Sequence, residues 1–159
     1  MKFYGWRVLA TLWAVALVTQ AFPNYGAGVI NAAMATDLGL ERSTLGLGFG
    51  LFVLTQGGTA PLIAWLVNRL GARLVIASGS VVITIAALAL ALLASEAWHY
   101  LLLFGLLMGT GSAVAGGIPL QTCTSLWFGR RRGLAMSIVM TTSSLGGFIA
   151  APLLGEMVS

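Results

Sequence analysis

The sequence predicts an all-α polytopic membrane protein with five transmembrane helices. Of the 159 residues, 58% are hydrophobic and only 8% are charged, whereas roughly a quarter of the residues in soluble domains are charged. The mean hydropathy is +0.97, and the apolar residues fall into five runs that each supply the roughly 20 residues a spanning helix needs. No water-soluble fold could bury so much apolar surface.

The five runs are separated by short polar gaps, and aromatic residues lie near several of their ends. Tryptophan and tyrosine favour the membrane–water interface, and Trp6, Trp65, Trp98 and Trp127 all lie near ends of runs. The first run exceeds the roughly 7 to 15 apolar residues of a signal peptide, so we expect it to remain as a helix. We therefore place helices at about residues 8–31, 44–67, 74–94, 100–126 and 133–154.

The positions of the charged residues predict the orientation of the helices. Seven of the eight basic residues precede the first run or lie in the second and fourth gaps, and all four acidic residues lie elsewhere. Positive charge is retained on the cytoplasmic side during insertion. We therefore expect a cytoplasmic amino terminus and an external carboxyl terminus of this chain, in a bacterial inner membrane. The same pattern explains the net charge of +4, so nucleic acid is not an expected partner.

The sequence contains no pattern typical of an enzyme or a metal site. Cys123 and His99 are the only cysteine and the only histidine, which excludes an internal disulfide and a multi-cysteine metal site. No nucleophile lies with a base in a recognisable pattern, and no phosphate-binding loop is present. No acidic or basic residue lies deep in any run. We therefore predict a protein that is not an enzyme and that uses no cofactor or metal.

Amide and hydroxyl side chains form stripes in the first and fourth runs. At 100° per residue, Gln20, Asn24 and Asn31 lie within about 40° of one another. Thr110 and Gln121 share a stripe in the fourth run. Glycine and proline interrupt both runs, which is the pattern expected where internal repeats meet around a midplane substrate site. Alternatively, these side chains only join helices, through hydrogen bonds of about 1 kcal/mol or less. The predicted substrate-binding residues are Gln20, Asn24, Asn31, Thr110 and Gln121.

The other runs carry weaker signals. The second has a short polar patch that includes Gln56. The third is nearly all apolar, and we expect its Ser78, Ser80 and Thr84 to bond to their own backbone, as in a lipid-facing helix. Glycines four residues apart predict close helix approach at two pairs, Gly46 with Gly50 and Gly105 with Gly109.

The turn between the second and third runs carries a recognisable pattern. Residues 64–73 read Ala-Trp-Leu-Val-Asn-Arg-Leu-Gly-Ala-Arg. This segment resembles the loop between helices two and three of the major facilitator superfamily, with Arg69, Gly71 and Arg73 at matching positions. Asn68 stands where an aspartate is usual. Residues 4–8 and 127–135 resemble the oxalate/formate antiporter and monocarboxylate porter group of that superfamily.

The resemblance implies a secondary active transporter with two six-helix halves, of which this chain is most of the N-terminal half and lacks the second. Such a protein, an antiporter or a symporter, would move a small organic solute, here a mono- or dicarboxylate, by alternating access. Helices one and four of the half would line the central cavity. The expected partners are this organic anion, the lipid bilayer and the missing C-terminal half.

The resemblance also implies a cytoplasmic gate formed by Asn68, Arg69, Gly71 and Arg73. The gate should be weaker than usual because Asn68 brings no charge. Two alternatives remain open: the arginines only anchor the topology, or the whole chain is a non-transporting truncated membrane protein that acts as an assembly or interaction partner. The odd number of helices is consistent with the second alternative.

Overall fold

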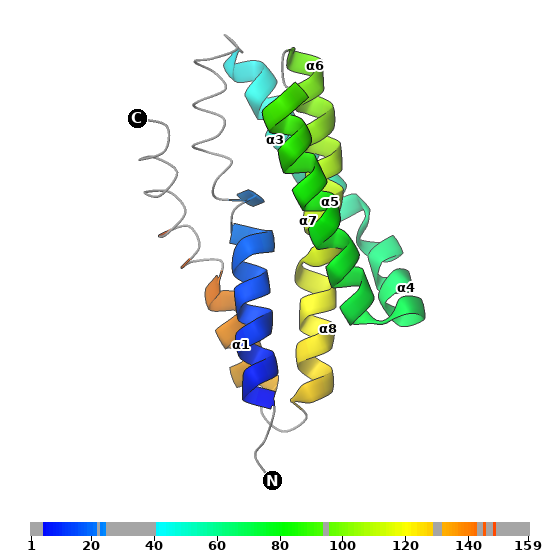
Figure 1. The fold of residues 1–159 in the computed structure, drawn as a ribbon, viewed down its shortest axis with the longest axis vertical. Coiled ribbons are helices and arrows are strands. Elements are labelled where there is room, and N and C mark those ends of the chain that lie inside the picture. The colour runs from blue at the N-terminus through cyan, green and yellow to red at the C-terminus, as the bar shows by residue number, and fades with distance from the viewer. Residues whose placement is uncertain are drawn as a thin grey trace.

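The chain folds into long helices that pack side by side, as the computed structural model shows for residues 5–21, 23, 24, 41–93, 96–128, 132–142, 145 and 148 (Figure 1). Every element that the structure describes in these ranges is helical, which confirms the predicted all-α class. In chain order the elements are α1 (Gly5–Ala16), the π-helical η1 (Leu17–Ala21), α3 (Arg42–Gly58), α4 (Ala60–Leu70), α5 (Ala72–Leu93), α6 (Ala97–Tyr100), the π-helical η2 (Leu101–Met108), α7 (Gly109–Ala115) and α8 (Gly117–Trp127). Residues 132–142 add a further helical segment.

Several of the described helices suit a bilayer by length and composition. Ala72–Leu93 and Ala97–Trp127 are each long and apolar enough to cross a membrane, and Trp6–Gln20 is a shorter apolar helix. Large apolar side chains point away from the protein, with Leu54 71% and Leu92 82% exposed. Such continuous apolar exposure is rare in soluble monomers and is what a lipid environment favours.

The helix predicted at residues 44–67 is divided into α3 and α4. The two helices meet at Thr59 with a bend of 46°. Pro61 lies in the first turn of α4, where it has no N–H to donate and its ring would clash with the carbonyl four residues earlier. The bend therefore has a local cause, and it turns α4 away from the direction of α3.

The turn between α4 and α5 is a single glycine. Gly71 has φ 84°, the only positive φ among the described residues, and this conformation costs glycine little because it has no Cβ. Its N–H donates to the Val67 carbonyl at 3.0 Å, which closes the end of α4. The chain can thus reverse direction and begin α5 at Ala72.

The core is densest where α5 packs against α7 and η2. A Cβ built on Gly79 of α5 would lie only 2.4 Å from the backbone nitrogen of Ala115, so the two backbones are in direct contact. Beside this contact Phe52, Tyr100 and Phe104 are fully buried. Their rings stack, with centroids 5.3 Å apart for Phe52 and Phe104 and 5.2 Å apart for Tyr100 and Phe104.

The hydroxyl side chains of α5 are satisfied within their own helix. Ser78, Ser80 and Thr84 donate to the carbonyls of Val75, Ile76 and Ser80 at 2.8, 2.9 and 2.9 Å. These bonds confirm the prediction that the hydroxyls satisfy themselves on their own helix. The helix therefore presents no free polar group at these positions.

A second apolar cluster joins the start of the chain to its later helices. Leu9, Leu12 and Ala16 of α1 pack with Leu120 of α8 and with Val139 of the 132–142 segment. Trp6 meets Phe128 edge to face, with ring centroids 5.8 Å apart. Helix α1 is thus held between α8 and the last described helix (Figure 1).

Candidate functional site

The candidate site is built around a break in the fourth predicted helix. Helix α7 ends at Ala115 and α8 begins at Gly117, with Gly116 between them at φ −98° and ψ −137°. The Gly116 N–H donates to the Ala113 carbonyl at 3.3 Å, although a continuous helix would direct it to the carbonyl of Ser112. The break therefore frees the Ser112 carbonyl for another donor.

Gln20 supplies that donor from the first helix. Its Nε2 donates to the Ser112 carbonyl at 3.1 Å. The amide occupies the space beside Gly116, because a Cβ built there would lie 1.7 Å from Gln20 Nε2. Gln20 lies on η1, where the helix widens to a π-helical turn, and such turns are frequent at functional sites.

The Ser112 side chain forms hydrogen bonds with residues of α3 and η1. Ser112 is fully buried. Its hydroxyl accepts a hydrogen bond from Gln56 Nε2 at 3.1 Å and donates to the Thr19 carbonyl at 3.4 Å. One residue of α7 therefore contacts both η1 and α3.

Asn24 extends the cluster by one turn of the first helix. Its Nδ2 donates to the Gln20 carbonyl at 2.8 Å and lies 3.4 Å from Gln20 Oε1. Two of the predicted substrate-binding amides are therefore in contact. The second bond would also fix which way the Gln20 amide is turned.

The two glutamines border a cavity of about 290 Å³. Each carboxamide has two N–H donors and an acceptor oxygen, and its bond to Ser112 uses one donor. Each can therefore offer further hydrogen bonds to a small molecule in the cavity. The first two residues of α8 also line this space. The lining residues are Gln20, Gln56, Ala60, Ile63, Ala113, Gly117 and Ile118.

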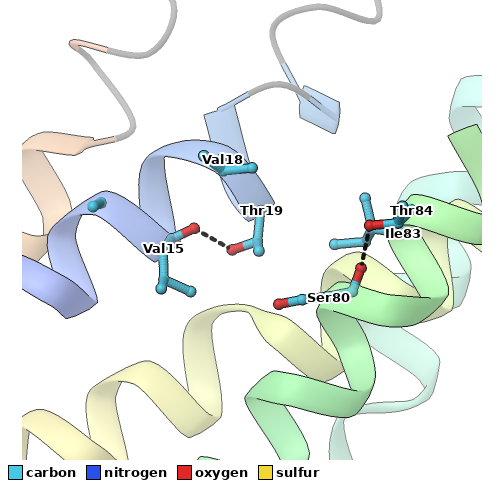
Figure 2. A pocket seen from close by; sticks show the side chains of 7 residues that line it. Val15, Val18, Thr19, Ser80, Ile83 and Thr84 are labelled. Atoms are coloured by element: carbon cyan, nitrogen blue, oxygen red, sulfur yellow. Dashed lines mark hydrogen bonds between the residues drawn. The ribbon is translucent and has the colours of Figure 1, made fainter.

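A second cavity, of about 360 Å³, lies between the first helix and α5 (Figure 2). The hydroxyls of Thr19, Ser80 and Thr84 line it, but each donates to a carbonyl of its own helix. Figure 2 shows the bonds of Thr19 to Val15 and of Thr84 to Ser80. Because these donors are already used, the wall is apolar in character, and the amide-lined cavity is the better candidate for a polar ligand.

Two other predicted substrate-binding residues, Thr110 and Gln121, do not line the cavity beside Gln20. Thr110 is half-buried and donates to the Leu107 carbonyl at 2.9 Å, and it is not among the residues lining the cavity. Gln121 is exposed on α8, and its Nε2 lies 3.9 Å from the position of a Cβ built on Gly117. It is therefore next to the cavity wall. Asn31 lies outside the described residues.

Sequence reasoning did not assign Gln56 or Ser112 to the site. Gln56 had a detectable signal, because an amide inside a membrane span is costly unless it is bonded. Ser112 had none, since a serine within a helix normally bonds to its own backbone. Only the fold shows that both face Gln20.

The predicted gate residues surround the turn between α4 and α5 (Figure 1): Asn68 and Arg69 lie in the last turn of α4, Gly71 forms the turn, and Arg73 lies in the first turn of α5. Asn68, Arg69 and Arg73 are all exposed. The guanidinium carbon of Arg69 lies 5.2 Å from the centroid of the Trp65 ring, within range of a cation–π contact. Gly71 provides the backbone reversal between the two arginines.

Residues 10–159 match the family model of the Major Facilitator Superfamily. The chain belongs to this superfamily. It is 30% identical over 151 residues to monocarboxylate transporter 13 of Rattus norvegicus, covering 94% of the chain and 34% of that protein. It is 26% identical over 148 residues to the uncharacterized MFS-type transporter YcxA of Bacillus subtilis (strain 168), covering 93% of the chain and 36% of that protein.

The superfamily assignment has consequences for the chain as a whole. The chain is an integral membrane protein of a transporter family whose members handle small molecules. It spans about a third of the length of the relatives named above. A more distant similarity is to the fujikurins efflux protein of Gibberella fujikuroi, 34% identical over 101 residues, or 64% of the chain and 21% of that protein. No solved structure matches the chain significantly.

Proposed function

We propose that the protein is a secondary active transporter that moves a small mono- or dicarboxylate across the membrane by alternating access. This chain would supply the first five helices of its N-terminal half. The observation that carries the proposal is the meeting of Gln20 and Gln56 at Ser112, on the edge of a cavity beside a broken helix. Polar side chains in a membrane interior mark substrate pathways when they face a cavity.

The chemistry of the cavity suits a carboxylate. Gln20 and Gln56 offer neutral N–H donors, and Gly117 and Ile118 are the first two residues of α8. The first N–H groups of a helix have no acceptor within the helix and lie at the positive end of its dipole. Amide donors and a helix start together favour an anion over a cation. The cavity of about 290 Å³ is at the lower end for ligand pockets, which favours a small solute.

The names of the relatives support the same class of solute. Besides the rat protein, monocarboxylate transporter 7 of Homo sapiens is 27% identical over 150 residues, 94% of the chain. We propose that Asn68, Arg69 and Arg73 act at a cytoplasmic gate. Their exposure in this chain leaves them available for contact with a second half of the transporter.

Uptake measurements in cells that express the full-length protein test the proposal. We expect uptake of radiolabelled lactate or oxalate. We also expect Gln121→Leu and Gln20→Leu to lower it while the amount of protein in the membrane stays unchanged. Loss of a hydrogen bond to a charged group costs about 1.5 to 3 kcal/mol, which corresponds to roughly a tenfold to hundredfold loss of affinity.

Ser78→Ala is the matched control, because that hydroxyl bonds only within α5. We expect this variant to transport normally. Normal uptake by Gln121→Leu would remove Gln121 from the site. If the wild-type protein takes up neither probe, the carboxylate proposal fails. Uptake by the purified 159-residue chain in liposomes would instead show that the five helices transport on their own.

A further inference from the structure

Ser112 differs from the threonines of α7 and α8. Thr110, Thr122 and Thr124 donate to carbonyls three or four residues earlier, at Leu107, Ile118 and Leu120. This is the usual behaviour of serine and threonine in helices. The hydroxyl of Ser112 instead donates to Thr19 of η1 and accepts from Gln56 of α3. It is therefore a cross-helix group among neighbours that satisfy themselves locally.

The backbone of Ser112 makes a matching connection. Its carbonyl is released by the break at Gly116 and accepts from Gln20 Nε2 at 3.1 Å. The two atoms of Ser112 thus bind the two glutamines that line the cavity. Because Ser112 is fully buried, water cannot replace either bond without entering the core.

We propose that Ser112 is the positioning residue of the substrate site: its hydroxyl orients the Gln56 amide, and its carbonyl orients the Gln20 amide. This inference rests on the proposed function, because it takes the cavity as the substrate site. Ser112 itself is assigned no contact with the solute. Fixing one N–H of each amide limits how that amide can turn, and leaves its second N–H for a ligand in the cavity. The hydroxyl and the carbonyl are separable, because a side-chain substitution removes only the first.

The prediction is testable by NMR of the full-length protein in lipid nanodiscs, with ¹⁵N on glutamine side chains. The signals of Gln20, Gln56 and Gln121 are assigned from their loss in the three Gln→Leu variants. In Ser112→Ala we expect the Gln56 side-chain signal to shift and its hydrogen exchange to accelerate, because its acceptor is gone. The Gln121 signal should stay in place, since that residue is exposed and lies outside the Ser112 bonds.

Ser112→Cys is the second variant, because it nearly preserves side-chain volume while offering only a weak acceptor; we expect the same shift of Gln56. Ser78→Ala is the control for the loss of a hydroxyl elsewhere and should move none of the three signals. In transport assays with lactate or oxalate, we expect Ser112→Ala to raise KM about fivefold, as for the loss of one net hydrogen bond, with a smaller change in maximal rate.

An unshifted Gln56 signal in both Ser112 variants would overturn the inference, and so would an equal shift in Ser78→Ala. The NMR measurement needs no solute. A failure of the wild-type protein to transport either probe would therefore overturn the proposed function alone. The NMR shifts would still show whether Ser112 orients the Gln56 amide.

Discussion

At Gly116 the amide of Gln20 occupies the space that a side chain would need. A Cβ there would lie 1.7 Å from Gln20 Nε2 and 2.4 Å from the Ser112 carbonyl oxygen. At the next position, Gly117, the nearest atom to such a Cβ is Gln121 Nε2 at 3.9 Å, an ordinary contact. Two adjacent glycines therefore have different reasons for lacking a side chain.

We predict that Gly116→Ala destabilises the chain by roughly 1 to 3 kcal/mol, the usual cost of overpacking, and that Gly117→Ala does not. The measurement is thermal unfolding of the 159-residue chain in detergent, monitored as the fraction of protein that remains monodisperse. Only a side chain at Gly116 would meet Gln20 Nε2 and the Ser112 carbonyl oxygen, so the difference between the two variants reports the crowding at Gly116. An equal loss in both variants would mean that the helix break itself, and not Gln20, requires glycine.

Thr110 and Ser112 both lie on α7, but their hydroxyls donate to carbonyls in different parts of the chain. Both residues precede the break at Gly116, and the stripe in the sequence favours Thr110. In the fold the Thr110 hydroxyl donates to a carbonyl close by in the chain, whereas the Ser112 hydroxyl forms hydrogen bonds with α3 and η1. The direction of a hydroxyl depends on which acceptors the fold brings within reach.

At the scale of the elements, close packing depends on glycines in only some of the expected places. Gly105 and Gly109 face α3 closely, with a built Cβ 2.8 Å from Leu51 and 3.1 Å from the Phe52 carbonyl oxygen. The equivalent expectation for Gly46 and Gly50 is wrong within the described residues, since a Cβ there would meet nothing within 4 Å. The spacing of four residues indicates that a helix can be approached and leaves open which neighbour approaches it.

We predict that Gly79→Ala destabilises the 159-residue chain, because its Cβ would force α5 away from the backbone of Ala115. The expected loss is roughly 1 to 3 kcal/mol, measured as the shift in unfolding temperature in detergent. Gly46→Ala is the matched control and should be neutral or slightly stabilising, because alanine favours helix by up to about 1 kcal/mol. Equal destabilisation by both substitutions would argue against a tight α5–α7 contact.

At the scale of the whole molecule, charges separate toward the two ends of the helix bundle. The start of α1, which carries Arg7, and the turn from α4 to α5, which lies between Arg69 and Arg73, both lie toward the lower end of Figure 1. The starts of α3 and α6 lie toward the other end (Figure 1), and they carry Glu41 with Arg42 and Glu96, respectively. Because positive charge is retained on the cytoplasmic side, we predict that the end that carries Arg7, Arg69 and Arg73 faces the cytoplasm.

Labelling of single cysteines tests this orientation. In a cysteine-free full-length background that includes Cys123→Ser, we expect Ser43→Cys to react with a membrane-impermeant maleimide added to intact cells. We expect Asn68→Cys to react only after the cells are permeabilised. Both side chains are exposed in the fold, so access from one side of the membrane should decide the result. The reverse pattern would place the arginine turn outside.

Much of the architecture is readable from the sequence, because it follows from local properties. The apolar runs, the Gly71 turn and the hydroxyls of α5 that satisfy their own helix each depend on neighbours a few residues away. The bend of α3 into α4 has a local cause too, in Pro61, although the run alone suggested one continuous helix. The pattern of residues 64–73 indicates the superfamily in the same local way.

The site depends on contacts between distant parts of the chain. Gln20 and Asn24 share a helix, and their stripe is visible in the sequence. The bonds from Ser112 span 92 residues to Gln20, 56 to Gln56 and 93 to Thr19. The sequence by itself determined a helical membrane protein of a transporter family, because hydropathy and short motifs are local. Only the tertiary structure decided which polar groups meet, because a hydrogen bond needs two atoms about 3 Å apart and no single sequence states which helices are neighbours.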